Sequence, residues 1–308
     1  MRISTNMLYS QLSGHMSQAA SDLARLQGQV ASGNKFNTAS QAPDVVARAL
    51  AIESRLSGFQ ADVDTVGQVR MGVDAQASAM ESSQTLLSRL KELSLQGASQ
   101  QYTQTERDAI AVEVHSLKAS LVDLANAKDP NGRYVFSGTN SSTPPYVMDA
   151  NGVVTYQGGT APLRVKIGDS GYEDATAVGP AAWQGVVRPA AGSGTPQRVD
   201  LFGVVSDLEQ SLRTNSRQDI SRAVDELTTV ADHVQTSMAK LGASQNRLQL
   251  AQTTAEDLTT RAKTALSDIK DLDYATALGD LKKQETLLQA SQSLLGRLSQ
   301  LSLLEYMR

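Results

Sequence analysis

Cysteine is absent from this chain of 308 residues, and its absence excludes disulfides, thiolate metal ligands and cysteine nucleophiles together. Aromatic residues make up only 4% of the chain. Large rings dominate the energetics of compact cores. A chain with few rings but abundant Leu, Ala, Ser and Gln therefore favours elongated helices that pack through small side chains.

A basic excess and long apolar runs are also missing. The formal charge is −4 and the pI is near 5.5, which argues against a nucleic-acid partner because such proteins usually carry a basic surface. No window holds the roughly 20 apolar residues that a membrane helix needs, and the first residues lack the apolar region of a cleaved secretory signal. We therefore expect no membrane insertion, and these facts alone favour a cytoplasmic protein.

Residues with catalytic or metal-binding chemistry are scattered. The three histidines, His15, His115 and His233, stand alone on predicted helices, and no H-E-x-x-H spacing occurs. Asp271 and Asp273 lie in a short break between helices, where a capping role is the simpler interpretation. The sequence therefore predicts that the chain is not an enzyme and binds no metal or cofactor.

The middle of the chain differs in composition from both ends. Seven of the eight prolines lie at 130–196, a stretch that also holds about half of the glycines and the one tryptophan. Turn-forming residues interleaved with β-branched and aromatic ones predict short strands, of which 132–136 and 153–156 are the clearest. The pair Asn151-Gly152 predicts a hairpin turn.

The N-terminal part shows helical periodicity. Apolar side chains recur with alternating steps of three and four, and such a heptad seam needs a partner helix. The helix should end at Gly33, which suits a left-handed C-terminal cap. We expect the N-terminal assembly seam to consist of Tyr9, Leu12, Met16, Leu23, Leu26 and Val30.

Two further helices should follow. The second begins at Pro43, which fits the first turn of a helix, and runs to about Gln96, where Gly97 interrupts it. Thr103 and Glu106 then have the spacing of a capping box, which predicts the start of a third helix.

The periodicity returns in the C-terminal part. From Ile220 to Ile269, twelve of the fifteen positions on the alternation of three and four are apolar. At 1.5 Å per residue this helix would reach roughly 75 Å, far beyond an ordinary globular helix. Its seam must be covered, and the N-terminal helices are the available surface. The rod seam is predicted to consist of Leu56, Phe59, Val63, Val66, Val224, Leu227, Val234, Met238, Leu241 and Leu248.

A final amphipathic helix continues to the C-terminus. The chain should therefore be mostly α with a β-rich insertion. Both chain ends should build a long antiparallel helical rod or coiled coil, with a small β domain at one tip and both termini at the other. The predicted segments are an N-terminal assembly helix at 1–40 and a C-terminal assembly helix at 271–308. Between them we expect the first part of the rod at 41–128, the β-rich outer domain at 129–203 and the second part of the rod at 204–270.

Runs of residues near both ends resemble the terminal signatures of the flagellin superfamily. The run LARLQGQVASGNKFN at 23–37 is similar to the N-terminal signature, and ASQNRL at 243–248 with IKDLDYAT at 269–276 looks like the C-terminal one. The resemblance covers about 1–128 and 215–308. The chain departs from the family at 40–44, where members usually carry an acidic pair.

Three features are similar to the junction-forming members of this superfamily rather than to its filament flagellins. They are the opening MRIST, the segment DPNGRYVFSGTN at 129–140 followed by Pro144-Pro145-Tyr146, and the ending LLEY at 303–306. The resemblance implies a secreted structural subunit of the bacterial flagellum, which forms the junction between hook and filament after export by the flagellar type III apparatus.

The resemblance also implies partners. They are other hook-associated proteins, flagellin and copies of the chain itself in a tubular ring, with an export chaperone at the C-terminal helix. The residues that would serve assembly and chaperone binding there are Leu281, Leu288, Leu295, Leu298, Leu301 and Leu304. Two alternatives stay open: a filament flagellin with a short variable domain, and a cytoplasmic coiled-coil adaptor.

Overall fold

A computed structural model describes residues 2–168, 171–188 and 196–306, with side chains described at Met7 and, within those ranges, from Ser10 to Arg297. The chain forms two compact units. The terminal unit comprises Met1–Gly58 with Asp257–Arg308, and the central unit comprises Phe59–Glu256. Two helices, α2 (Pro43–Ala98) and α6 (Arg217–Lys270), contribute residues to both units.

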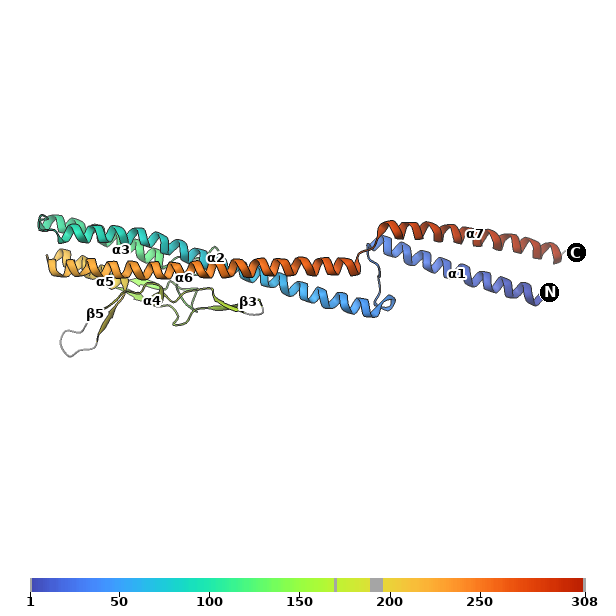
Figure 1. The fold of residues 1–308 in the computed structure, drawn as a ribbon, viewed down its shortest axis with the longest axis horizontal. Helices are drawn as coiled ribbons and strands as arrows, with labels where there is room; N and C mark the ends of the chain where they lie inside the picture. Colours follow the sequence, from blue (N-terminus) through green and yellow to red (C-terminus); the bar gives the residue numbers. More distant parts are fainter. Residues whose placement is uncertain (1, 169–170, 189–195, 307–308) are drawn as a thin grey trace. The chain divides into compact units, whose positions relative to one another are not determined.

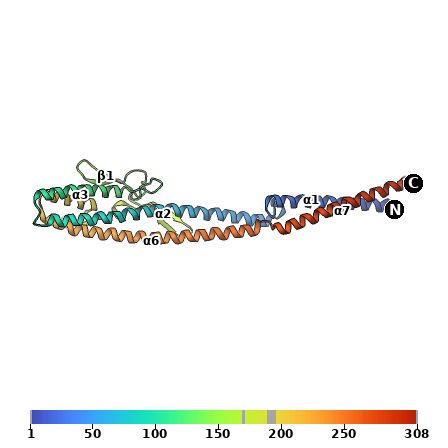
Figure 2. The same cartoon turned by 90° about the horizontal axis from the view of Figure 1, so that it is seen from above.

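The terminal unit is dominated by the two end helices. Helices α1 (Arg2–Ser32) and α7 (Tyr274–Tyr306) lie side by side and run in opposite directions (Figures 1 and 2). The two chain ends therefore lie at the same end of this pair, as the periodicity predicted.

The predicted end of α1 and the predicted start of α2 are confirmed. Gly33 follows the last residue of α1 with a φ of 72°, a left-handed conformation that glycine adopts at low cost. Helix α2 begins at Pro43, whose missing N–H would have no intrahelical partner in the first turn. A short 3-10 helix, η1 (Ala39–Gln41), lies between them.

The predicted interruption of α2 at Gly97 is wrong. The helix continues through Gly97 to Ala98. Gly97 is buried, and a Cβ there would overlap the side chain of Leu212. This glycine allows another helix to approach closely instead of ending its own. Helix α3 (Gln104–Ala125) then opens with the predicted capping box between Thr103 and Glu106.

The central unit packs α2, α3 and α6 together with α5 (Leu201–Arg213). Sequence reasoning missed α5, although its signals are present. Asp200 caps its first turn by accepting a hydrogen bond from the Gly203 N–H. Its apolar side chains follow a helical spacing and are fully buried at Leu201, Phe202, Val204, Val205, Leu208 and Leu212.

The β-rich insertion forms three separate antiparallel hairpins in the described part of the chain. They pair β1 (Tyr146–Met148) with β2 (Val154–Tyr156), β3 (Arg164–Ile167) with β4 (Gly171–Asp174), and β5 (Val186–Arg188) with β6 (Gln197–Val199). Tyr146 pairs with Tyr156, and Gly152 has a φ of 79°. The predicted hairpin turn at Asn151-Gly152 is therefore confirmed.

The predicted strand at 132–136 is wrong. These residues form an irregular loop with a single bridge between Lys128 and Tyr134. Gly132 and Gly138 bracket the loop with φ values of 79° and 60°, so the backbone turns before an extended run can form. The loop instead buries Phe136, which lies edge-on against Trp183 with 5.1 Å between the ring centroids.

The insertion rests on the flank of the central-unit helices (Figure 1). The segment after β4 lies on α2, where the Gln76 side-chain amide donates to the Ala175 carbonyl at 3.3 Å. Short helix α4 (Gly179–Ala182) follows and leads to the buried Trp183. The prediction of a mostly α fold with long antiparallel helices and a small β-rich insertion is confirmed.

Candidate assembly surfaces

The end helices meet through the predicted alternation of three and four. In α1 the half-buried positions are Leu12, Met16, Leu23, Leu26 and Val30, with Ala19 buried between them. In α7 the facing positions are Ala277, Leu281, Gln284, Leu288, Ser291 and Leu295. The Gln284 amide donates to the Ala19 carbonyl at 3.3 Å, which fixes the register of the pair. The small and polar members of this seam keep the two helices close but bury little apolar surface.

Three of the predicted seam residues in this pair lie in α7 beyond the described side chains, and one lies in α1. They are Leu298, Leu301, Leu304 and Tyr9. Their roles, and those of the other end-helix residues in contacts between subunits, stay predictions.

A clasp joins the end of α1 to the start of α7, and we define it as residues 29–37 with 267–274. The Lys35 N–H donates to the Lys270 carbonyl at 2.8 Å, and the Leu272 N–H donates to the Gly33 carbonyl at 2.8 Å. The Lys35 ammonium group also donates to the Asp268 carbonyl at 2.6 Å. Segments more than two hundred residues apart in sequence are therefore locked together by backbone hydrogen bonds, which sequence periodicity could not reveal.

Asp273 caps the first turn of α7. Its carboxylate accepts from the N–H of Ala275 at 3.0 Å and from the hydroxyl of Thr276 at 2.8 Å. The Thr276 hydroxyl and backbone N–H, followed by the Ala275 N–H, lower the pKa of this carboxyl. The predicted capping role of Asp273 is confirmed.

Helix α7 carries more leucine than its contact with α1 covers. Leu278, Leu287 and Leu294 lie outside the seam and remain 50%, 50% and 52% exposed. Exposed apolar residues that follow one another along a helix mark an interaction surface when they form a contiguous patch. At about 3.6 residues per turn, Leu287 and Leu294 share one flank of α7 and Leu278 lies on the opposite flank. The end helices therefore offer an internal seam and separate exposed leucines on either side of it.

The predicted rod seam divides into a buried and a half-buried set. Val66, Leu227, Val234 and Leu248 are buried in the central unit. The half-buried residues are Leu56, which belongs to the terminal unit, and Phe59, Val63, Val224, Met238 and Leu241. Val66 and Leu248 share one apolar cluster, so the structure brings these two predicted residues together.

Polar contacts flank this cluster and fix how α2 and α6 lie against each other. The Arg70 guanidinium donates to Gln249 at 2.8 Å and Gln252 at 3.0 Å, and the Gln245 amide donates to Asp74 at 2.7 Å. These pairs show an antiparallel arrangement within the central unit. Subunit contacts made by the seam stay a prediction.

Buried charges tie the other helices of the central unit together. Arg107 is 2% exposed and donates to the carbonyls of Gly97 and Ser99, both at 2.8 Å, and to the Asn215 side chain at 2.9 Å. It therefore binds the C-terminal end of α2 and the turn between α5 and α6. Cations at a helix C-terminus interact favourably with its dipole.

A second buried cation, Lys118 of α3, pairs with Glu209 of α5 at 2.8 Å. Burial raises the pKa of the Glu209 carboxyl, but hydrogen bonds from Lys118, Arg213 and His115 outweigh it, and the pKa is lowered overall. Sequence reasoning missed both buried cations because a charged residue on a helix usually faces solvent.

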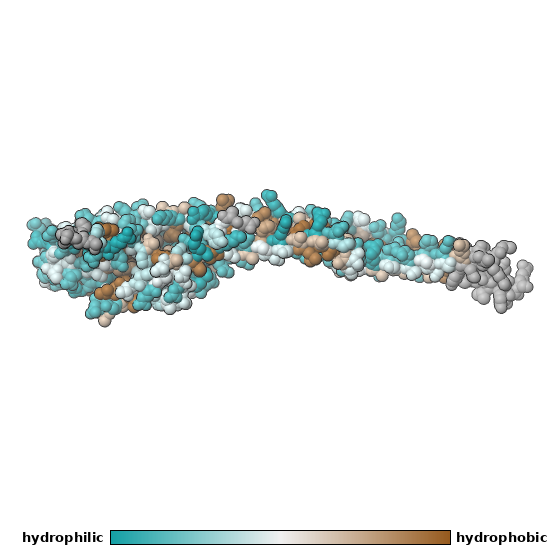
Figure 3. Space-filling view, turned by 90° about the horizontal axis from the view of Figure 1, so that it is seen from below, coloured by the Kyte–Doolittle hydropathy of each residue, from teal (hydrophilic) through white to brown (hydrophobic). Residues whose placement is uncertain are grey.

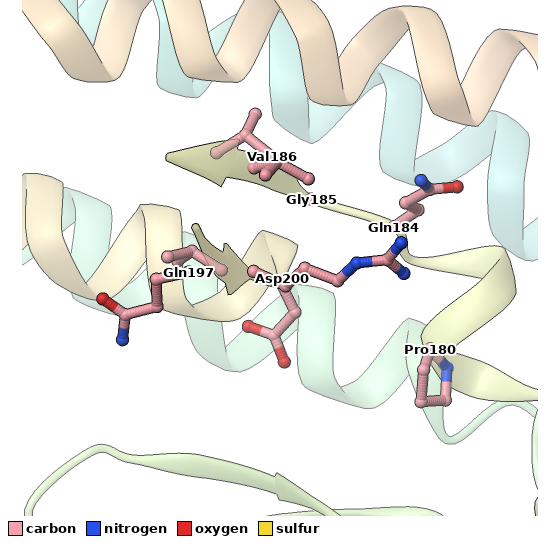
Figure 4. A pocket seen from close by; sticks show the side chains of 9 residues that line it. Pro180, Gln184, Gly185, Val186, Gln197 and Asp200 are labelled. Atoms are coloured by element: carbon pink, nitrogen blue, oxygen red, sulfur yellow. The ribbon is translucent and has the colours of Figure 1, made fainter. Parts of the chain in front are cut away.

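One cleft of the β-rich insertion carries no catalytic arrangement. It has a volume of about 400 Å³ and lies between α4 and the hairpin β5–β6. Figure 4 shows Gln184, Val186, Gln197 and Asp200 around it, with Pro180 on α4 at its edge. Burial raises the pKa of Asp200, whose carboxylate is engaged in capping α5. Among the lining residues no nucleophile lies beside a base.

The histidines and acids are equally dispersed in the part of the chain that the structure describes. His115 contacts Glu209, and His233 lies 3.4 Å from the Gln184 carbonyl. No group of three or more potential metal ligands occurs among the described residues. Within the same residues, every helix is too short or too polar to span a membrane.

The fold thus defines a helix-rich protein whose two ends pair with each other and whose β-rich part is an insertion between helical segments. Family models agree with this division. The bacterial flagellin N-terminal helical region matches residues 3–141, and the bacterial flagellin C-terminal helical region matches residues 222–307. The two matches together cover most of the chain. The chain belongs to the bacterial flagellin family, whose members are structural proteins of the flagellum.

Curated relatives match over nearly their whole length. Flagellar hook-associated protein 3 of Escherichia coli is 22% identical over 321 residues, with 99% of each chain covered. The protein of the same name from Salmonella typhimurium is 22% identical, with 94% of this chain and 95% of the relative covered. A flagellin of Listeria innocua is also 22% identical, with 97% of this chain and 96% of the relative covered.

Solved structures share the fold. A flagellar hook-associated protein from Vibrio parahaemolyticus aligns with a TM-score of 0.64 at 17% identity, over 75% of this chain and all of that one. The flagellar junction protein from Legionella pneumophila aligns with a TM-score of 0.56 at 15% identity, over 66% of this chain and 99% of that one.

Proposed function

We propose that this chain is the structural subunit that joins the hook of the bacterial flagellum to its filament. The observation that carries the proposal is the match to flagellar hook-associated protein 3 of Escherichia coli over 99% of both chains. The role is structural and not catalytic. It requires surfaces that bind other subunits, and the end helices supply them.

The end helices suit assembly for a physical reason. Their mutual seam contains Ala19, Gln284 and Ser291, so the pair gains little from its own apolar contact. Leu278, Leu287 and Leu294 stay exposed on the outside of α7. Burying these leucines against neighbouring subunits stabilises helices that are marginal by themselves. A repeated heterologous contact between copies then generates a ring or tube.

Export and partners follow from the same proposal. The chain would leave the cell through the flagellar type III apparatus, with a chaperone held on Leu281, Leu288 and Leu295 of α7 before export. In the flagellum it would contact other hook-associated proteins, flagellin and copies of itself. A filament subunit is the second candidate, because a flagellin of Listeria innocua matches over a similar share of both chains.

Deletion of the gene separates the two candidates. We expect bare hooks, with filament subunits shed into the medium, because the filament then has no seat. Bare hooks without any filament subunit in cells or medium would show that the chain is itself the filament subunit. Intact filaments on every hook would refute both roles. A copy of the gene supplied on a plasmid is the control and should restore filaments.

A further inference from the structure

A groove of about 340 Å³ lies in the central unit between the β-rich insertion and helices α2 and α6. Its floor is apolar and includes Met80, Phe136, Ala182 and Leu241. The face that carries β3, α4 and β5 is otherwise mostly hydrophilic, with hydrophobic residues in small separate patches (Figure 3). An apolar hollow in such a surface suits an apolar side chain from a partner.

One basic residue at the rim of this groove is left outside the ion pairs of the described residues. Arg247 pairs at 2.9 Å with Glu173, which is buried and also accepts from the Ser244 hydroxyl. Asp174 pairs with Arg164 at 3.3 Å. Lys240 is exposed and lines the same rim, and among the described residues it has no acidic partner. The groove therefore favours an apolar side chain that arrives with a carboxylate.

The hairpin β1–β2 of the same chain has this chemistry. Val147 and Val153 are 40% and 53% exposed. Asp149, at its turn, uses one carboxylate oxygen to accept from the N–H groups of Asn151 and Val153, both within 2.9 Å. Residues 144–157 contain no Lys or Arg, so the hairpin carries a net negative charge.

Other exposed apolar residues of the central unit match the groove less well. Tyr172 stacks with Arg164 at 5.7 Å, and Val187 is followed directly by Arg188. The remaining ones lie each on a different helix, Leu95 on α2, Val112 on α3 and Leu250 on α6. Two exposed valines and an acid on one hairpin fit a concave site better than a single side chain on a helix.

The hairpin cannot reach the groove of its own chain. It lies over α3, where a Cβ on Gly152 would be 3.1 Å from the Lys118 ammonium group, and Figure 2 shows β1 beside α3. The groove is lined by α2, α4 and α6, and Figure 1 shows α4 next to α6. The two surfaces are therefore different patches of one unit, and a contact between them in two copies is heterologous.

We propose that the hairpin β1–β2 of one copy docks in the groove of the next copy, with Val153 on the apolar floor and Asp149 facing Lys240. The proposal rests on the proposed function, because it makes this contact one of the lateral joints of the ring. A heterologous joint links each copy to two others and closes only through the symmetry of the assembly.

Disulfide cross-linking tests this contact directly, because the chain has no cysteine of its own. A full-length variant with Val153→Cys and Lys240→Cys is expressed in a gene-deleted strain, and sheared flagella are oxidised. We expect a ladder of dimers, trimers and larger species, because each copy offers one cysteine to each neighbour. The matched control combines Val153→Cys with Val112→Cys, whose native side chain is 63% exposed on α3.

The proposed contact predicts different cross-linked species for the two cysteine variants. A ladder from the first variant and none from the control supports the contact. A ladder of equal strength from both, dimers only, or no cross-linked species overturns it. The deletion phenotype, scored in the same strain without cross-linking, tests the proposed function, and the cross-linking tests the contact. A failure of one is therefore distinguishable from a failure of the other.

A charge exchange provides a second measurement that does not depend on cysteine. Lys240→Glu should reduce the fraction of hooks that carry filaments, because the groove would then repel Asp149. Adding Asp149→Lys in the same chain, at the residue that faces Lys240 in the proposed contact, should restore that fraction. An unchanged fraction in Lys240→Glu, or no recovery in the double variant, would contradict the contact. Secretion of each variant into the medium shows that it is exported, and far-ultraviolet circular dichroism of the purified variant shows that it folds.

Discussion

Two glycines of α2 make a matched pair for testing how the β-rich insertion sits on the helices. Gly67 and Gly72 both lie inside α2 and within the central unit. A Cβ at Gly67 would have no atom within 4 Å, whereas a Cβ at Gly72 would lie 2.8 Å from the Ala175 carbonyl oxygen. The same substitution by alanine should therefore have opposite effects at the two sites.

The expected magnitudes follow from two opposing terms. Alanine in place of glycine inside a helix stabilises it by about 1 kcal/mol, and Gly67→Ala should show this gain alone. At Gly72 the added methyl meets backbone, which cannot rotate away, and overpacking of this kind costs about 1–3 kcal/mol. Gly72→Ala should therefore be neutral or destabilising by up to about 2 kcal/mol, with a difference between the two variants of about 1–3 kcal/mol.

Equilibrium unfolding in urea measures this difference. Trp183 is the one tryptophan of the chain and is fully buried in the central unit, so its fluorescence reports the unfolding of that unit. Far-ultraviolet circular dichroism follows the helices in the same samples. The midpoint of the Trp183 transition should lie at or below the wild-type urea concentration in Gly72→Ala and above it in Gly67→Ala.

Equal stabilisation by both substitutions would refute the argument, because it would mean that the segment after β4 does not rest on α2. The variant Gly242→Ala, in α6 of the same unit, extends the control, since a Cβ there also meets nothing within 4 Å. A change in the slope of the transition rather than in its midpoint would indicate a change in the exposed surface on unfolding instead of a clash.

Three further predictions follow from particular contacts. Arg107→Met should lower the unfolding free energy of the central unit by at least about 2 kcal/mol, because the buried Gly97 and Ser99 carbonyls lose their donor. Urea unfolding measures this loss, with the exposed Arg217→Met as the control. A loss no larger than that of the control would contradict the prediction. Since the pKa of Glu209 is lowered in the fold, its ion pairs stabilise the protein fully above its ordinary pKa of 4.5 and progressively less as the pH falls through the lowered value. Glu209→Gln should therefore be less stable than wild type at neutral pH, and its stability should fall less on acidification. If the melting temperatures of the variant and of the wild type changed in parallel with pH, the pairing with Lys118 would be contradicted. Gly33→Ala should weaken the clasp by about 1–2 kcal/mol, because a left-handed residue gains a Cβ that would also lie 2.9 Å from the Tyr274 hydroxyl. Amide exchange in α1 and α7 should then be faster in Gly33→Ala than in the control Gly14→Ala. Equal exchange rates in the two variants would contradict this prediction.

Much of the helical architecture was predictable from local pattern. Heptad spacing located α1, α6 and α7, and the capping residues Gly33, Pro43 and Thr103 marked where helices end or begin. These signals are readable because caps and amphipathic seams depend on residues within a few positions of each other. The family signatures at 23–37 and 269–276 were readable for the same reason, since each is a short contiguous run.

Other features depended on contacts between distant segments. Gly97 has the local signature of a helix breaker, and only its contact with Leu212 explains why the helix passes through it. The strand predicted at 132–136 has β-forming residues but no neighbouring strand, because the loop is used to bury Phe136 against Trp183. Arg107 and Lys118 are ordinary helix residues in the sequence, and their burial depends on acceptors in other helices.

The assembly surfaces show the same division. The sequence by itself determined which leucines of α7 recur with a helical period, because a period needs no partner. Only the tertiary structure decided that Leu281, Leu288 and Leu295 turn towards α1 while Leu278, Leu287 and Leu294 stay exposed. A single helix has no inside or outside until a second helix covers one of its faces, and the clasp that brings α1 to α7 joins residues that are far apart in the chain.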